Sequence, residues 1–136
     1  MEVLQKIPTV VLDPYLLMSM SAVLPNGALA TCLYARFAIC DHIPPGDFLP
    51  EEYEQLMQAI NRENVETLSV PAVEIADLLP MRNVLVLNQI ATIAAARYHG
   101  GMFASDCCTF RRAATTVLKP AHILCGRQVR QRFNLN

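Results

Sequence analysis

The chain has 136 residues, 53% of them hydrophobic, which suits one compact domain with a core and argues against a disordered chain. Its net charge is -1, and it contains no apolar stretch of the roughly 20 residues needed to span a bilayer. The N-terminal residues lack the charged start and long apolar middle of a signal peptide, and the five cysteines form no CxxC pair. We therefore expect one domain over residues 1–136 of a cytoplasmic protein with reduced thiols.

The N-terminal half is predicted to contain an extended arm followed by helices. Residues 7–12, IPTVVL, include β-branched residues but have no obvious strand to pair with, so we expect an extended arm. Asp13 and Pro14 are typical of a helix start, and a short apolar helix follows them. Residues 28–40 place apolar side chains on one side at helical spacing, which predicts another helix. We interpret residues 50–69 as two short helices joined by a seam, the first of them amphipathic.

The C-terminal half is also predicted to be helical. Proline residues delimit a short helix over residues 73–79, and the apolar stretch over residues 83–99 predicts a central buried helix that ends at a pair of glycines. Ser105 and Asp106 are interpreted as the cap of a further helix, and Pro120 as the start of the last one. The sequence therefore predicts an all-α fold, a single compact domain of six or seven short helices with an extended N-terminal arm.

Charge is distributed unevenly along the chain. Residues 41–77 contain nine acidic residues against the single Arg62, whereas residues 107–136 contain six basic residues and no acid. Such a basic region is suited to phosphate contacts or to an acidic protein surface. We predict nucleic-acid contacts for its six basic residues, which are Arg111, Arg112, Lys119, Arg127, Arg130 and Arg132.

Enzyme and metal chemistry is weakly indicated. Cys107 and Cys108 begin a predicted helix near two arginines, which would favour a thiolate, but buried inert cysteine is commoner in a helical core. His122 and Cys125 are three residues apart, a spacing that is not diagnostic of zinc. Residues 74–90 have the cadence of a helix-turn-helix, yet the second helix is too apolar to read bases, so we favour a buried hairpin. We expect no catalytic residue, no metal and no cofactor.

Three segments resemble the D subunit of the bacterial flagellar master transcriptional activator. They are PYLLMSMSAVL, ATCLYARFAI and EEYEQLMQAINRENVETLS, and together the resemblance covers residues 14–70. It implies an all-helical, dimerising subunit that works with a partner protein to bind promoter DNA and activate transcription. It also implies that Tyr34 and Arg36 are the positions closest to the partner contact.

These observations lead to one preferred function and one alternative. We expect a helical, oligomeric regulatory subunit of a nucleic-acid-associated complex, forming homo-oligomers or binding a protein partner, with possible DNA contact. The alternative is a protein-interaction adaptor or inhibitor that binds no nucleic acid. An enzyme is the third hypothesis, and we expect the protein not to be one.

Overall fold

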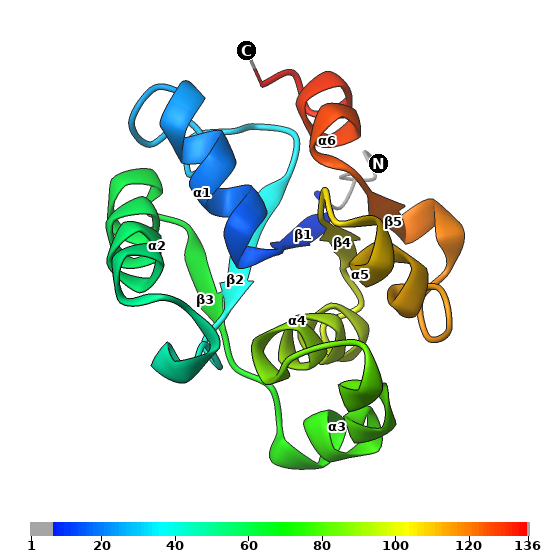
Figure 1. The fold of residues 1–136 in the computed structure, drawn as a ribbon. Helices are drawn as coiled ribbons and strands as arrows, with labels where there is room; N and C mark the ends of the chain where they lie inside the picture. The colour runs from blue at the N-terminus through cyan, green and yellow to red at the C-terminus, as the bar shows by residue number, and fades with distance from the viewer. Residues whose placement is uncertain (1–6, 136) are drawn as a thin grey trace.

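The fold is a parallel β-sheet covered by helices on both faces, as seen in a computed structural model that describes residues 7–135 (Figure 1). Five strands lie in the order β3-β2-β1-β4-β5, and each neighbouring pair is parallel. The all-α prediction is therefore wrong, and the protein has an α/β fold. Parallel neighbours require crossover connections, which the helices between successive strands supply.

The first strand is the predicted arm. β1 (Thr9–Leu12) lies in the middle of the sheet, where it pairs with β2 (Arg36–Cys40) on one side and with β4 (Met102–Ala104) on the other. Val10, Val11 and Leu12 are fully buried, because helices cover both faces of a central parallel strand. The sequence shows the β-branched residues of this strand, but its partners are distant along the chain.

Two more predicted helices are wrong for a related reason. Residues 28–31 form a turn and residues 33–34 a bend, and β2 then begins at Arg36 and is buried on both faces after that first residue. The seam after residue 63 leads into the edge strand β3 (Glu66–Leu68). A short run of buried apolar residues fits a strand as well as a helix, so periodicity does not separate the two.

The two helices that follow β1 and β2 begin where the sequence predicts. In α1 (Pro14–Val23) the Asp13 side chain caps the first turn, and Pro14 occupies the first helical position. A short 3-10 turn, η1 (Pro45–Asp47), leads to α2 (Pro50–Glu63), which ends at Asn64 in the left-handed conformation. Acidic residues in the first turn of α2 favour this helix through its dipole.

The C-terminal half alternates short helices and short strands. The predicted buried helix begins later than expected, at Leu87, and the predicted basic helix is divided by a strand. The bounds are α3 (Ala72–Asp77), η2 (Leu79–Asn83), α4 (Leu87–Tyr98), α5 (Cys108–Ala114), η3 (Pro120–His122), β5 (Ile123–Leu124) and α6 (Gly126–Arg132).

Each face of the sheet has its own apolar core. Alternate strand residues point to opposite faces, so Val10 and Leu12 join one core and Val11 joins the other. The first core packs α1, α2 and α6 on one face, and the second packs α4 and α5 on the other face, which we call the α1 face and the α4 face (Figure 1). This arrangement places the loops after the strands at a single edge of the sheet.

Candidate ligand site at the carboxyl edge of the sheet

The order in which the chain adds strands to the sheet reverses between β1 and β4: β2 and β3 lie on one side of β1, and β4 and β5 lie on the other. The connection after β1 leads through α1 to β2, and the connection after β4 leads through α5 to β5 on the opposite side. The loops therefore separate at the carboxyl ends of these two neighbouring strands. In open α/β sheets this switch point is where ligands bind.

Two loop residues meet directly at the switch point. Asp13 follows β1 and is only 4% exposed, and Ser105, which is fully buried, follows β4. The Ser105 hydroxyl donates a hydrogen bond to Asp13 Oδ2 at 2.7 Å, and the Tyr15 backbone N–H donates to Asp13 Oδ1 at 3.0 Å. Ser105 Oγ also accepts a hydrogen bond from the Cys107 N–H, so these contacts hold both loops together.

Asp13 has a shifted ionisation equilibrium. Burial raises the pKa of its carboxyl above the ordinary value for aspartate, and the negative charge of nearby Asp106 raises it further. The hydrogen bonds from Ser105 and Tyr15 oppose this increase because they stabilise the carboxylate. Titratable groups shifted by burial and a specific charge in a cleft are candidates for functional groups.

Asp106 lies next to this pair and is exposed. Its Oδ1 accepts a hydrogen bond from the Gly126 N–H at 2.7 Å, which ties the β4–α5 loop to the start of α6. A Cβ at position 126 would lie 2.8 Å from Leu16 Cδ1 and 3.0 Å from each Asp106 oxygen. Only glycine fits this close approach without a shift of its neighbours.

A third loop joins the same edge from β2. Asp47 Oδ2 accepts hydrogen bonds from the Asn88 backbone N–H at 2.8 Å and from its side-chain amide at 3.0 Å. The Asp47 carboxylate thus lies at the N-terminus of α4, where the helix dipole favours negative charge. Asn88 is buried, and its Oδ1 has no hydrogen-bond partner among residues 7–135.

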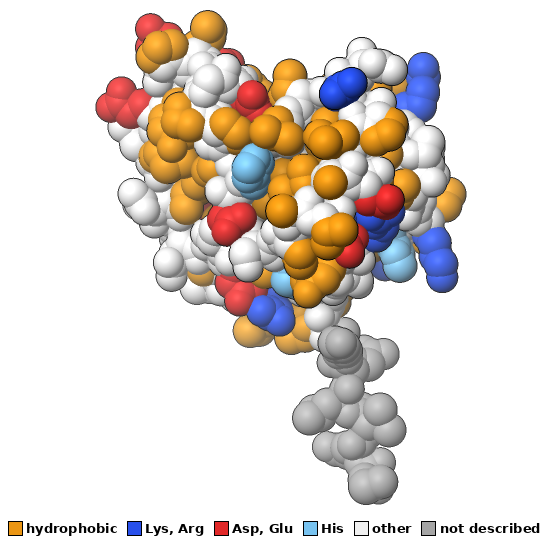
Figure 2. Space-filling view, turned by 90° about the horizontal axis from the view of Figure 1, so that it is seen from below, with side chains coloured by type: hydrophobic (Ala, Val, Ile, Leu, Met, Phe, Trp, Pro, Cys, Tyr) orange, Lys and Arg blue, Asp and Glu red, His pale blue; other side chains and the backbone are white. Residues whose placement is uncertain are grey.

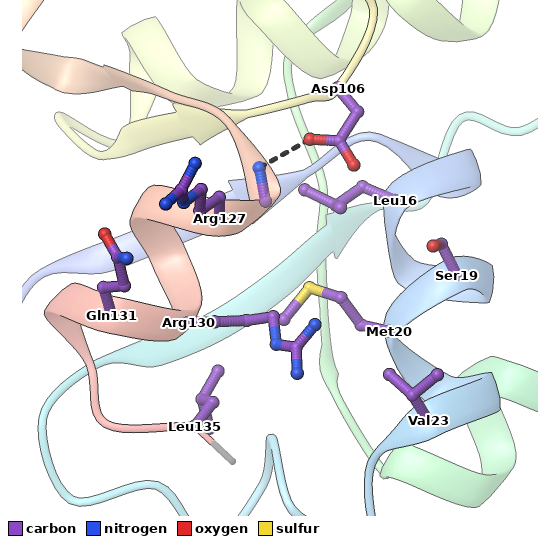
Figure 3. Close-up of a pocket in the computed structure, with 10 residues that line it drawn as sticks. Leu16, Ser19, Met20, Val23, Asp106, Arg127, Arg130, Gln131 and Leu135 are labelled. Atoms are coloured by element: carbon purple, nitrogen blue, oxygen red, sulfur yellow. Dashed lines mark hydrogen bonds between the residues drawn. The ribbon is translucent and has the colours of Figure 1, made fainter.

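A groove of about 460 Å³ runs from Asp106 between α1 and α6. Its α1 wall is apolar at Leu16, Met20 and Val23, and its α6 wall carries Arg127 and Arg130. Figure 3 shows the Arg130 side chain extending from α6 toward the α1 wall. Neither arginine forms a salt bridge with any other residue between 7 and 135.

The other four predicted basic residues lie outside this groove. Arg111 donates a hydrogen bond to a backbone carbonyl of the β4–α5 loop at 2.7 Å, and together with Arg112 it lines a shallower hollow of about 280 Å³. The Arg132 guanidinium lies 5.7 Å from the centre of the Phe133 ring, and Lys119 is exposed before η3. The structure therefore brings two of the six predicted residues together at a groove.

The two predicted partner-contact residues have different environments. Tyr34 is 57% exposed in the loop before β2. Arg36 begins β2 and pairs with Glu66 of β3, with its Nη2 2.7 Å from Glu66 Oε1. Arg36 is thus engaged within the chain, whereas Tyr34 is available on the surface.

The cysteines and histidines do not come together as a metal site. All five cysteines are free, and Cys107 and Cys108 are exposed. Between residues 7 and 135, no three His, Cys, Asp or Glu side chains are close enough together to hold a metal ion. In the same part of the chain no helix is long and apolar enough to cross a membrane.

Comparison with known proteins finds no family model that matches the chain and no curated protein with significant sequence similarity. The resemblance to the flagellar activator subunit over residues 14–70 therefore stays a prediction, and the all-helical fold that it implies is not the fold observed.

Sequence reasoning noticed Asp13, Ser105 and Asp106 but interpreted them only as helix caps. A signal for the site was present, because Asp13 directly follows the run TVVL and Ser105 directly follows the apolar MFA. Polar residues that end two buried parallel strands meet at one edge of a sheet. This signal depends on recognising the strands first.

Proposed function

We propose that the protein binds nucleic acid through phosphate contacts in the groove between α1 and α6, as a subunit of a cytoplasmic regulatory complex. The observation that supports this is the pair Arg127 and Arg130, which line one groove at the switch-point edge and form no salt bridge within residues 7–135. Unpaired arginines beside a concave surface attract and orient phosphates.

Charge around the groove also supports this proposal. Asp106 is the single acidic residue among those that line it, and its Oδ1 is engaged by the Gly126 N–H. The remaining lining is apolar or uncharged, so the two guanidinium groups carry the local positive charge. A backbone phosphate placed between them would release counterions on binding.

The test is fluorescence anisotropy of a labelled oligonucleotide over a salt series from about 50 to about 300 mM. The double variant Arg127→Ala/Arg130→Ala should weaken binding and reduce the salt slope by about one unit for each lost contact. A matched control is Arg112→Ala/Lys119→Ala, which removes two exposed charges outside the groove and should have the smaller effect. Equal effects of the two double variants, or no binding by the wild type, would contradict the proposal.

A second candidate function is metal-assisted cleavage of the bound phosphodiester. It is favoured by two carboxyl groups that lie near each other at the switch point, the buried Asp13 and the exposed Asp106. Magnesium is commonly bound by one or two carboxylates together with substrate phosphates and water. This candidate opposes the expectation that the protein is not an enzyme.

Cleavage is tested with an end-labelled oligonucleotide in Mg²⁺ or Mn²⁺, with a chelator as the blank. Asp13→Asn and Asp106→Asn should each abolish cleavage while oligonucleotide binding persists. Asp77→Asn, on the remote α3, is the control for loss of one acid. Equal product in the Asp13 variant and the wild type would exclude this site as the source of activity.

Protein partners are proposed for a different surface. Figure 2 shows hydrophobic side chains spread over the underside of the molecule as drawn in Figure 1, where α3 lies. In the sequence from α3 to the start of α4, the large hydrophobic side chains that remain exposed are Val73, Leu79, Val84, Val86 and Leu87. Exposed apolar patches of this kind mark sites of protein contact. This surface supports self-association, and equally the alternative of an adaptor without nucleic-acid binding.

Sedimentation velocity, together with the oligonucleotide assay, tests self-association and distinguishes it from an adaptor that binds no nucleic acid. Val84→Glu should reduce self-association and leave oligonucleotide affinity unchanged, because residue 84 is not among the groove-lining residues. A wild type that is monomeric at micromolar concentration would contradict the proposed self-association. Oligonucleotide binding that is absent alongside intact self-association would favour the adaptor.

A further inference from the structure

A second hollow adjoins the arginine groove. It has a volume of about 370 Å³ and shares Leu135 with the first groove, and its wall continues from Val23 to Leu24 at the end of α1. The two hollows therefore follow one another along the same surface. Each falls within the size range of roughly 300 to 1,000 Å³ that small ligand sites occupy.

The two hollows differ in charge. The first contains Arg127 and Arg130, whereas the residues that line the second include no acid and no base. The second contains the polar groups of Asn26, Thr31 and Asn134 around an apolar lining. Such a pair suits a ligand that alternates a charged unit with an uncharged, flat, hydrogen-bonding unit, which is the chemistry of a nucleotide chain.

An exposed aromatic residue that belongs to neither apolar core lies at the second hollow. Tyr34 lines it and is 57% exposed, and its neighbour Leu33 is 78% exposed. Neither residue belongs to the apolar core on either face of the sheet. Exposed aromatic rings next to a cationic groove are the usual stacking platforms for unpaired bases.

We propose that Tyr34 and the second hollow form a subsite that stacks a base of a single-stranded nucleic acid whose backbone phosphate Arg130 contacts. This inference rests on the proposed function and makes it more specific. A base paired within a duplex is covered on both faces by its neighbours, so only a single strand offers a free face to the ring. The strand therefore runs from the arginine groove past Leu135 to Tyr34.

The first experiment compares affinity for a labelled single strand, as DNA and as RNA, and for the duplex of the same sequence. Tyr34→Ala should weaken single-strand binding about fivefold or more and leave duplex binding unchanged. Tyr34→Phe keeps the ring and should bind like the wild type. Tyr98→Ala removes another exposed tyrosine, at the end of α4, and is the matched control.

The second experiment reads stacking directly. The chain contains no tryptophan, so Tyr34→Trp introduces a single tryptophan, whose emission can be excited selectively, at the subsite. Its emission should be quenched as the unlabelled single strand is titrated, and the quenching should saturate with the same affinity as the anisotropy. Addition of inorganic phosphate alone should leave the emission unchanged.

The outcomes separate this inference from the proposed function. Loss of binding in the double arginine variant with no effect of Tyr34→Ala and no quenching would overturn the subsite and leave the proposed function standing. Loss of self-association in Tyr34→Ala with unchanged nucleic-acid affinity would also overturn it, in favour of a protein contact. No nucleic-acid binding by the wild type would overturn both.

Discussion

The two faces of the sheet are covered in different ways. On the α4 face, small side chains such as Ala91, Ala94 and Ala95 let one helix lie close against β1, β2 and β4. On the α1 face, the larger side chains of Leu16 and Met20 pack among three helices, α1, α2 and α6, and a groove lies between α1 and α6. The α4 face is therefore closely packed against the sheet, whereas the α1 face has a groove, which is the proposed phosphate-binding surface.

The largest effect is expected in the core of the α4 face. Phe103 of β4 is fully buried, and its ring centre lies 4.6 Å from that of Phe110. Phe103→Ala should lower the free energy of unfolding by about 3 to 5 kcal/mol, through lost burial and a cavity. Urea denaturation measures the change. The control Val23→Ala, at a 64% exposed groove position, should change the free energy of unfolding by no more than about 0.5 kcal/mol. Equal losses at both positions would contradict the difference between the two faces.

The second largest effect is expected from overpacking the core of the α4 face. Ala95→Leu adds volume where α4 packs on the sheet with no exposed surface, and should lower the free energy of unfolding by about 1 to 3 kcal/mol. Ala22→Leu, at an exposed position of α1, is the matched control and should be close to neutral. Thermal unfolding of the two variants side by side measures this difference. A tolerated leucine at position 95 would mean that α4 is not closely packed.

The contribution of the carboxyl edge to stability should depend on pH, unlike that of the two apolar cores. Because folding raises the pKa of Asp13, its contribution to stability is full below the ordinary pKa of about 3.9 and is lost as pH rises through the folded pKa. Asp13→Asn removes this dependence and retains an acceptor for the Tyr15 N–H. The variant should therefore gain stability relative to the wild type as pH rises above the ordinary pKa of about 3.9, as measured by urea denaturation at each pH.

The control for this titration is Glu54→Gln, which removes one negative charge from an exposed position of α2. Its stability relative to the wild type should change less with pH. A constant difference between Asp13→Asn and the wild type across the whole range would contradict the raised pKa.

The smallest effect is expected at the far edge of the sheet. The Arg36–Glu66 pair joins β2 to β3 through two nitrogen donors but is largely exposed, so water and salt screen it. Arg36→Gln should lower the melting temperature only slightly at low salt, and the difference should disappear at high salt. Lys119→Gln, outside the sheet, is the control. A loss that persists in high salt would show that the side-chain stem of Arg36 matters more than its charge.

Local signals in the sequence were enough for the starts of α1 and α2 but not for the sheet. Asp13 and Pro14 predicted α1 correctly, because a capping side chain and a fixed proline torsion act within one turn. Val10 and Phe37 form a registered pair of parallel strands, and nothing near either residue specifies the other. The prediction of an all-α fold failed at this step.

Part of the candidate site was predictable for the same reason. Arg127 and Arg130 were selected by charge alone, and their spacing places both on one side of α6 at the groove. Asp13 and Ser105 meet only because β1 and β4 are neighbours, so their relation depends on topology. The groove itself arises from the gap between α1 and α6, which are at opposite ends of the chain.

The position of β1 also determines how the chain can fold. β1 precedes the other four strands along the chain and lies in the middle of the sheet, yet its partner β4 comes much later, and Ser105 is 92 positions from Asp13. Contacts between such distant segments raise the contact order, and they slow folding because a long loop must close first. During synthesis β1 can pair with β2 early, but its other edge stays open until residues 102–104 arrive. An open edge on an apolar strand invites pairing with other chains, so this edge is where a chaperone would protect the nascent protein.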